Sequence, residues 1–311
     1  MNAVPEHIWL NGEVVPWERA TVHISSEVAT RGANVFEGIR AYWLDGTGQY
    51  AVVAPREHLR RLMRSLRLLS LPCPFDEGEL MAGIGEIAAT MRPGDHLYLR
   101  PTVYVSRLSR TAGGQTGGEA GVATGAYITA YDVPLPSGEP IACIISSWQR
   151  PSDLVWPALV KAGAPYFGLR LAKLEAINRG ADDAILLNSH GLVAEAAGSA
   201  VVVVKDGTVY SPPASDGALD SITRAMIGRM LAVEYGGRLI EKSLSKSELY
   251  GADEVFLCGT LEQIVPVGSI DSIKIGDGGT GELTKKIQDS YTAACLAAPG
   301  HHGWLSREDL A

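Results

Sequence analysis

The second half of the chain places the strongest limit on the fold, because strand-like and helix-like segments alternate along it. Short apolar runs rich in β-branched residues stand at 141–148, 183–188, 199–210 and 253–259. Longer segments in which apolar residues recur at helical spacing stand at 168–180, 221–236 and 282–297. We therefore expect a sheet that packs against helices in this part of the chain.

The first third mixes strands with one amphipathic helix. Strand-like sequences occur at 7–15, 38–44, 50–55 and 96–105. The helix is predicted over 56–71, where the apolar residues at helical spacing are Leu59, Leu62, Met63, Leu66 and Leu69. This part is expected to be an α+β domain.

The length of 311 residues, of which 46% are hydrophobic, is most naturally divided between two domains. The Pro- and Gly-rich segment "DVPLPSGEP" at 132–140 is the predicted linker. The expected fold class is a two-domain α+β and α/β fold, with a small N-terminal domain at 1–131 and a large C-terminal domain at 141–311. A Gly-, Ala- and Thr-rich loop is expected at 109–125.

The composition favours small-molecule chemistry. A formal net charge of −8 gives no sign of the basic field that nucleic acid or an anionic membrane attracts. No apolar run approaches the ~18 residues of a membrane span, and the N-terminal sequence lacks a signal-peptide pattern, so a cytoplasmic location is expected. Far-apart cysteines without zinc-like spacing are expected to be buried thiols, not metal ligands: Cys73, Cys143, Cys258 and Cys295.

Lys161 is the first candidate catalytic residue. It stands alone among apolar and small residues in "WPALVKAGAPYFG" at 156–168, whereas lysines usually lie on solvated faces. A lysine in a desolvated pocket is the ordinary nucleophile of Schiff-base chemistry. The alternative is a surface lysine whose aliphatic stem covers apolar neighbours.

Glu195 is the second candidate. It lies in a small-residue turn between a strand-like run and the "VVVV" run at 201–204. A carboxylate in such a place needs a positive partner, and a protonated pyridine nitrogen would serve. The alternative is a turn carboxylate in contact with water.

Eight sequence blocks then occur in a familiar order. They are "VFEGIRAY" (35–42), "REHLRRL" (56–62), "YLRP" (98–101), "SSW" (146–148) with Lys161 and Tyr166 after it, "EAAG" (195–198), "SITR" (221–224), "ADEVFLCGT" (252–260) and "GWL" (303–305). In this order, from Ile8 to about Leu305, the chain resembles the branched-chain aminotransferases. Those are fold-type IV enzymes, with the fold of D-amino acid aminotransferase, that use pyridoxal 5′-phosphate (PLP).

The resemblance implies a PLP site. Lys161 would hold PLP as an internal aldimine and move a proton between the substrate Cα and C4′, while Glu195 would pair with the pyridinium nitrogen. Tyr166 would bond the phenolic oxygen; its alternative is a core tyrosine. The phosphate would be bound by Arg61, by backbone N–H groups at a helix start, and by a threonine after a strand, which adds Ile222, Thr223 and Thr260.

The implied activity is ping-pong transfer of an amino group from an α-amino acid, most naturally L-leucine, L-isoleucine or L-valine, to an α-keto acid such as 2-oxoglutarate. A homodimer or higher homo-oligomer follows from the same resemblance, with the loop before 35–42 reaching the site of the neighbouring subunit. The implied substrate-binding residues are Arg31, Phe36, Gly38, Arg40, Tyr98, Arg100 and Leu261.

Some positions depart from the family pattern. Arg31 replaces a tyrosine, and together with Arg100 it offers a bidentate grip on a carboxylate; alternatively it faces solvent or pairs with Glu37. The linker is short and lacks the family's tryptophan loop, Leu261 and Glu262 replace small residues, and "EAAGSAVVV" and "LDSITR" replace the family's asparagine and "PGITR". A D-amino acid or (R)-amine transaminase is therefore an alternative, as is a PLP lyase of the aminodeoxychorismate-lyase kind.

Other functional classes receive less support. "GDGGTG" at 276–281 matches a dinucleotide-binding fingerprint, but too little sheet can follow it, so it is interpreted as a loop into the last helix. No G-x-S-x-G hydrolase motif occurs. A non-catalytic binding protein on the same fold stays open, and absence of bound PLP would be its sign.

Overall fold

The computed structural model describes residues 4–108 and 122–296, and this part forms two compact units. The first unit takes the described residues up to Leu135 and the segment Val160–Tyr166; the second takes Pro136–Leu159 and the described residues from Phe167 onward. The break at Leu135 falls within the predicted linker. The segment that contains Lys161 packs with the first unit, whereas the predicted division assigns it to the C-terminal domain.

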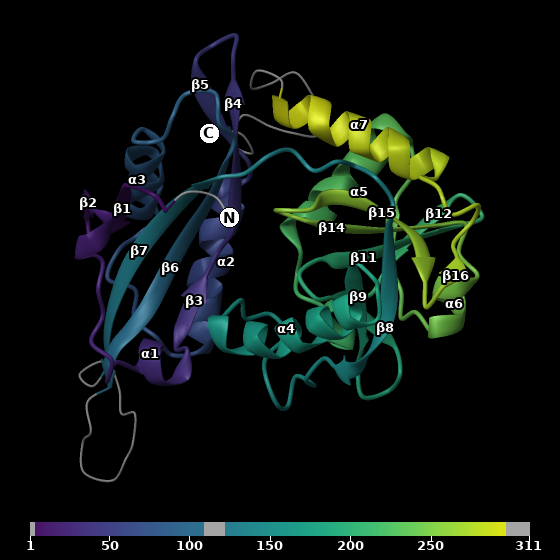
Figure 1. Ribbon diagram of the computed structural model, residues 1–311, viewed down its shortest axis with the longest axis horizontal. Helices are drawn as coiled ribbons and strands as arrows, with labels where there is room; N and C mark the ends of the chain where they lie inside the picture. Colours follow the sequence, from purple (N-terminus) through teal and green to yellow (C-terminus); the bar gives the residue numbers. More distant parts are fainter. Residues whose placement is uncertain (1–3, 109–121, 297–311) are drawn as a thin grey trace. The chain divides into compact units, whose positions relative to one another are not determined.

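The first unit is built on an antiparallel sheet (Figure 1). Its described strands are β1 His7–Leu10, β2 Glu13–Pro16, β3 Asn34–Phe36, β4 Ile39–Leu44, β5 Gln49–Val52, β6 Leu97–Leu108 and β7 Val122–Asp132. They pair in the order β2-β1-β7-β6-β4-β5, and β3 pairs with β6. The helices are η1 Trp17–Arg19, α1 Glu27–Arg31, α2 Pro55–Leu68 and α3 Glu77–Ala88.

Helix α2 follows the predicted apolar spacing, since Leu59, Leu62 and Leu66 are fully buried on one face. Helix α3 is absent from the sequence-based expectations because three glycines interrupt its pattern. One of them has a packing role: a Cβ on Gly83 would lie 2.7 Å from the indole of Trp9, so only glycine lets α3 approach β1 there. The described end of the predicted 109–125 loop, residues 122–125, belongs to β7; the rest lies outside the described residues.

The second unit is built on a mixed sheet. Its strands are β8 Ile141–Gln149, β9 Asp183–Leu187, β10 Val193–Ala196, β11 Ala200–Lys205, β12 Thr208–Ser211, β13 Leu239–Glu241, β14 Glu254–Gly259, β15 Gln263–Ile270 and β16 Ile273–Lys274. Their order is β10-β9-β8-β15-β14-β11-β12-β13, with β16 on β15. The helices are α4 Gly163–Asn178, η2 Ala214–Asp216, α5 Ile222–Glu234, α6 Lys246–Tyr250 and α7 Glu282–Leu296.

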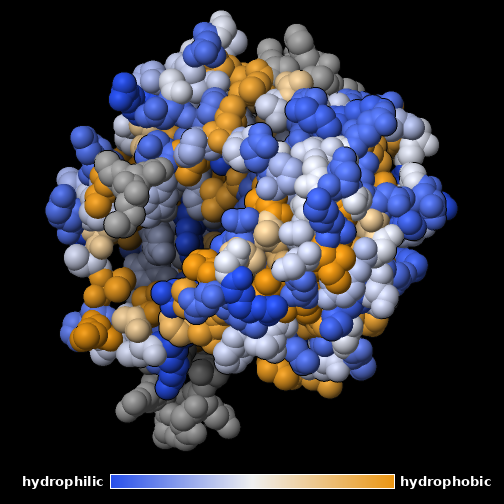
Figure 2. Space-filling view, turned by 45° about the vertical axis from the view of Figure 1, so that its right-hand side comes forward, coloured by the Kyte–Doolittle hydropathy of each residue, from blue (hydrophilic) through white to orange (hydrophobic). Residues whose placement is uncertain are grey.

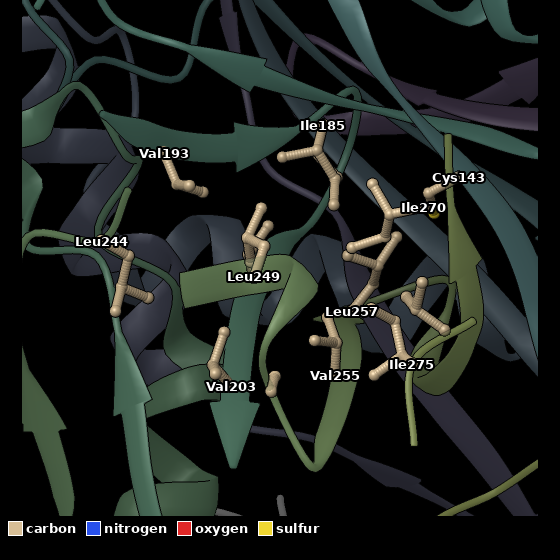
Figure 3. Close-up of a cluster of buried hydrophobic side chains, with 14 residues drawn as sticks. Cys143, Ile185, Val193, Val203, Leu244, Leu249, Val255, Leu257, Ile270 and Ile275 are labelled. Atoms are coloured by element: carbon tan, nitrogen blue, oxygen red, sulfur yellow. The ribbon is translucent and has the colours of Figure 1, made fainter. Parts of the chain in front are cut away.

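A buried apolar cluster holds the second unit together. Figure 3 shows β-branched and leucine side chains from several strands and from α6 converging on one region, among them Ile185, Val203, Leu249 and Leu257. The "VVVV" run lies in β11, where all four valines are buried, as expected for a strand covered on both faces. This cluster fixes the strands whose ends carry the candidate site residues.

Strand β10 carries an irregularity at a candidate residue. Val193 pairs with Leu187 and Glu195 pairs with Leu186, so Ala194 is an extra residue in the ladder. Such a bulge locally redirects the side chains of a strand. All four residues of β10 are buried, and this allows a carboxylate to lie inside the unit between alanines.

The glycine-rich segment at 276–281 is a loop that leads into α7. Gly276 and Gly278 have positive φ angles of 56° and 88°. The first N–H groups of α7 are bound by a side chain of the same unit, because Glu254 accepts from the N–H groups of Leu283 and Thr284 at 3.0 and 2.7 Å. This helix start is therefore occupied by a protein carboxylate.

The visible face in Figure 2 is mostly hydrophilic, with apolar residues scattered among the polar ones. Within residues 4–108 and 122–296, no helix has the length and apolar character needed to span a bilayer.

Candidate active site

The backbone around Lys161 is fixed within the first unit. The carbonyl oxygen of Lys161 accepts the N–H of Phe36 at 3.1 Å, and its own N–H donates to the Oγ of Ser65 at 3.3 Å. Val35 and Ala162 form an isolated antiparallel bridge next to these bonds. The lysine thus sits on a short extended segment held by β3 on one side and by α2 on the other.

The side chain of Lys161 lies among aromatic groups. Its Nζ donates to the hydroxyl of Tyr166, and it lies 5.0 Å from the ring centre of Phe36. The rings of Phe36 and Tyr166 pack edge to face at 5.0 Å. Lys161 and Tyr166 are expected to contact the same cofactor, and the bond between them is an additional observation.

A buried charge cluster underlies this region. The Nε and Nη2 of Arg61 donate to Oε1 and Oε2 of Glu37 at 2.7 Å each, and Nδ1 of His58 is 2.7 Å from the same Oε2. All three side chains are buried. Burial by itself would raise the pKa of Glu37, but the charge and hydrogen bonds of Arg61 and His58 outweigh it and lower that pKa to about 2. Burial lowers the pKa of His58.

The predicted substrate residues near Phe36 occupy one side of the first unit's sheet. A Cβ on Gly38 would lie 2.7 Å from Cε2 of Tyr98, so the absence of a side chain at residue 38 makes room for this tyrosine. The guanidinium of Arg100 lies 3.9 Å above the ring of Phe36. Its Nε is buried without a hydrogen-bond partner among the described residues.

Two other predicted substrate arginines have protein partners. Arg40 is buried and donates to the backbone carbonyls of Val133 and Pro134, at the start of the predicted linker. Arg31 is at the end of α1, where its Nη1 is 2.7 Å from Oε2 of Glu27 and 67% of its side chain is exposed. Glu37, the alternative partner considered for Arg31, is bound by Arg61 instead.

Glu195 lies in the second unit with an ion pair on one oxygen and a hydrogen bond on the other. Oε1 is 3.1 Å from Nη2 of Arg150, and Oε2 accepts the N–H of Leu219 at 2.8 Å. Arg150 also donates through Nε to the carbonyl of Gly217 at 3.1 Å. Both side chains are about nine-tenths buried, so Glu195 is a held carboxylate and not a solvated turn residue.

The predicted phosphate-binding residues of the second unit lie at the start of a helix and in a hairpin turn. Ser221 caps α5 by accepting the N–H of Arg224 at 3.2 Å, which leaves the N–H groups of Ile222 and Thr223 in the first turn. Thr260 and Leu261 stand in the turn between β14 and β15, and 41% of Leu261 is exposed. The carboxylate of Glu262 lies over Gly259, 3.0 Å from where a Cβ would be.

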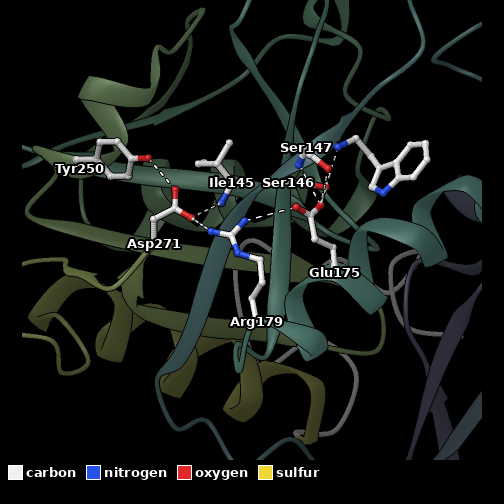
Figure 4. Close-up of polar contacts among 8 residues, drawn as sticks. Ile145, Ser146, Ser147, Glu175, Arg179, Tyr250 and Asp271 are labelled. Carbon is white, nitrogen blue, oxygen red and sulfur yellow. Dashed lines mark hydrogen bonds and ion pairs between the residues drawn. The ribbon is translucent and has the colours of Figure 1, made fainter.

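A polar network holds the end of β8, the strand that Arg150 follows (Figure 4). Glu175 on α4 accepts from Ser146 and Ser147 at the end of β8, at 2.7 to 3.1 Å. Arg179 joins Glu175 to Asp271, which also accepts from the hydroxyl of Tyr250 at 2.8 Å. Burial and this bond raise the pKa of Tyr250 to about 12.

Comparison with known proteins places this geometry in a family. The family model described as "Amino-transferase class IV" matches residues 34–270. The chain belongs to the class IV aminotransferases. It is 36% identical to the branched-chain-amino-acid aminotransferase of Escherichia coli K12, over 97% of both chains. It is 34% identical to a probable branched-chain-amino-acid aminotransferase of Aquifex aeolicus, over 91% of this chain and 90% of that one.

Solved structures of class IV aminotransferases have the same fold. The Escherichia coli branched-chain enzyme superimposes with a TM-score of 0.87 at 35% identity, covering 98% of this chain and 99% of that one. The enzyme of Thermobaculum terrenum in its PLP form gives 0.87 at 32% identity, covering 99% and 98%. The predicted family, fold-type IV fold and PLP-dependent aminotransferase class are therefore confirmed.

The side chains present fit PLP, which supplies an aldehyde that exchanges amino groups and a ring that takes up electrons from the substrate. Within the first unit an amine lies beside a phenol; within the second, a buried carboxylate and a helix N-terminus are present, and each of these groups has suitable chemistry. In addition, Ser199 Oγ and Gln263 Nε2 are buried next to the β14–β15 turn without hydrogen-bond partners in the described part of the chain. Such buried polar atoms favour a polar ligand.

Four residues that support the candidate site are not singled out by the sequence. Arg150 follows "SSW", Glu37 is part of "VFEGIRAY", and His58 and Ser65 lie on α2 at helical spacing from Arg61. A polar residue on the apolar face of an amphipathic helix was the available signal for His58 and Ser65. No comparable signal marks Arg150, whose partners are distant in sequence.

Proposed function

We propose that this chain catalyses ping-pong transfer of the amino group of branched-chain L-amino acids to an α-keto acid such as 2-oxoglutarate. The observation that carries the proposal is the Lys161–Tyr166 pair on its fixed backbone segment, in a chain 36% identical to a branched-chain aminotransferase. Lys161 would hold PLP at its aldehyde group, and its Nζ would move the proton between the substrate Cα and C4′. Tyr166 donates to the phenolic oxygen.

The remaining groups bind and orient. Glu195 pairs with the ring nitrogen, and the phosphate takes hydrogen bonds from Arg61, from the N–H groups of Ile222 and Thr223, and from Thr260. The substrate carboxylates are bound on the side of the first unit that carries Arg100, with Leu261 at the β14–β15 turn. One related branched-chain amino acid aminotransferase was solved in complex with N-(5′-phosphopyridoxyl)-L-glutamate, which is consistent with glutamate and 2-oxoglutarate as a substrate pair.

We also propose that the active form is a cytoplasmic homodimer. Three large apolar side chains of the second unit are strongly exposed in the single chain, since Leu154, Val155 and Phe167 are 99%, 76% and 73% exposed. Exposed apolar groups of this size favour an interface with another chain. Light scattering at micromolar concentration is expected to give twice the chain mass, and Leu154→Asp combined with Val155→Asp should shift it to one chain. A monomer in the wild type would contradict the proposal.

The function is tested by absorbance of the PLP-loaded protein. L-leucine, L-glutamate, D-alanine, D-glutamate and an (R)-arylamine are added separately, and L-leucine and L-glutamate are expected to convert the cofactor to its pyridoxamine form. If only the D-amino acids or the amine convert the cofactor, the proposed L-amino acid substrate class is wrong, while the proposed amino-group transfer through Lys161 stands. Lys161→Ala is expected to lose the borohydride-trappable PLP adduct, and a trapped adduct in that variant would overturn the role of Lys161.

A further inference from the structure

We infer that Arg150 is a positioning residue for the cofactor's ring nitrogen, acting through Glu195; this inference rests on the proposed function of Glu195. Arg150 is not among the site residues predicted from the sequence. It is 8% exposed; it forms an ion pair with Glu195, and its described hydrogen bonds run to Gly217 in the loop that follows η2 and to Leu187 of β9. A buried guanidinium held this way is expected to fix whatever carboxylate it binds.

The geometry leaves Glu195 little freedom. Arg150 forms an ion pair with Oε1 at 3.1 Å, and the N–H of Leu219 donates to Oε2 at 2.8 Å, so each carboxylate oxygen has a protein neighbour. A carboxylate has about four acceptor sites, so this arrangement leaves sites for another donor. Only one of the two neighbours is a side chain. Arg150 is therefore the position at which substitution can release Glu195.

The same arginine fixes the loop before α5. Its Nε donates to the carbonyl of Gly217, whose φ angle of 97° needs glycine. A Cβ on Gly217 would lie 3.6 Å from the Cβ of Arg150 and 3.8 Å from that of Ala194. The loop thus lies directly on Arg150 and β10, and four residues later the chain reaches the cap of α5 at Ser221. Arg150 therefore contacts both Glu195, the proposed partner of the ring nitrogen, and the loop that leads to the N-terminus of α5, the proposed phosphate site.

The two roles of Arg150 can be separated with a cofactor analogue. In 1-deazapyridoxal 5′-phosphate the ring nitrogen is replaced by C–H, so the aldehyde and phosphate remain and the partner of Glu195 is missing. Dissociation constants of PLP and of the analogue are measured by absorbance titration of the apo protein, for the wild type, Arg150→Met and Arg150→Lys. Thermal unfolding of each apo protein is measured alongside.

Arg150→Met is expected to weaken PLP binding by roughly tenfold or more, as for loss of one partner of a buried ion pair, and to change the affinity for the analogue by less than about threefold. Arg150→Lys retains the positive charge but lacks the planar guanidinium that contacts both Glu195 and Gly217, so an intermediate loss of PLP affinity is expected. The control is Lys285→Met, which removes a cation of the same unit that forms an exposed pair with Asp289 on α7. Its affinities for both ligands should stay within about twofold of the wild type.

Equal losses for PLP and the analogue would overturn the inference, because they would show that Arg150 merely supports the loop. A gain in PLP affinity would overturn it too, since Arg150 would then compete with the ring for Glu195. If Arg150→Met does not fold, Arg150→Lys carries the same comparison. Failure of the proposed function is a separate outcome: the wild type itself would then show no Lys161-dependent PLP absorbance.

Discussion

The N–H of Phe36 donates to the carbonyl oxygen of Lys161 at 3.1 Å, across 125 positions of sequence. This bond and the bridge between Val35 and Ala162 make the lysine segment an extra piece of the first unit, beside β3. The same residue of β3, Phe36, therefore supplies both the aromatic ring near the lysine side chain and the N–H that binds the lysine backbone. A lysine held in this manner has its Cα fixed, and only its flexible side chain moves.

Ser65→Ala is expected to impair this fixation. The Oγ of Ser65 is fully buried and accepts the N–H of Lys161, so its loss leaves a backbone donor without that partner at a cost of about 1 kcal/mol in unfolding free energy. Both kcat and PLP affinity should fall as well. The control is Ser106→Ala, which removes a hydroxyl bonded to Ala123 in the same unit and should cost stability alone. Unchanged kcat and PLP affinity in Ser65→Ala would contradict the role.

Glu37→Gln is expected to change the acid stability of the protein. Because the pKa of Glu37 is lowered from 4.5 to about 2 in the folded state, its ionised form stabilises the fold fully above about pH 4.5. That contribution, about 3 kcal/mol, is lost as pH falls toward 2. Urea unfolding at several pH values should show this slope in the wild type and not in the variant. Glu282→Gln, which removes an exposed pair with Lys286, should keep the slope; a slope retained in Glu37→Gln would refute the assignment.

Arg31→Tyr tests the carboxylate-binding hypothesis for Arg31. Its bond to Glu27 is an exposed i,i+4 pair, worth only about 0.3–0.5 kcal/mol, so the guanidinium can turn to a substrate at little cost. The variant is expected to weaken the keto-acid acceptor by roughly 1–3 kcal/mol with leucine nearly unaffected. Steady-state kinetics with 2-oxoglutarate measure it. Glu27→Gln, which releases Arg31, should leave the acceptor KM equal or lower, and an unchanged acceptor KM in Arg31→Tyr would remove the hypothesis.

Asp76→Ala is expected to destabilise α3 without affecting catalysis. Asp76 accepts the N–H of Glu79 at 2.8 Å, and the Glu79 carboxylate accepts the N–H of Asp76 at 2.8 Å, which completes a capping box. Loss of the cap should lower the unfolding free energy by about 1 kcal/mol, and Asp76→Ser should restore most of it. Denaturant unfolding gives the answer, and a change below about 0.2 kcal/mol would show that this helix end does not need its cap.

The fold was predictable where the apolar pattern was regular. Leu59, Leu62 and Leu66 repeat without interruption, and α2 lies within two residues of the expected start and three of the expected end. Helix α3 has glycine at 78, 83 and 85, which weakens the pattern, and its formation depends on tertiary contacts such as that of Gly83 with Trp9. Local sequence does not contain those contacts.

The candidate site divides in the same way. Lys161 and Tyr166 are five residues apart, so one short motif contains their bond. The partners of Glu195 are Arg150 and Leu219, each more than 20 positions away, and only the paired strands and the loop after η2 bring them together. Similarly, Arg61 was expected at the phosphate, but its bidentate bond to Glu37 could not be anticipated, because it depends on how α2 lies on the β3–β4 corner.

The extra residue Ala194 makes the direction of the Glu195 side chain depend on how many residues separate it from Val193. Side-chain substitutions in β10 leave the number of residues between Val193 and Glu195 unchanged, so they keep the bulge and the aim of the carboxylate. Deleting Ala194 would restore regular pairing with β9 and leave Glu195 opposite Leu186, so the carboxylate would keep its face of the sheet but lose the local bend and twist that the bulge adds. A variant that keeps the lysine but loses one residue here would therefore keep the fold and the face of the carboxylate, with the carboxylate aimed in a different direction along the strand.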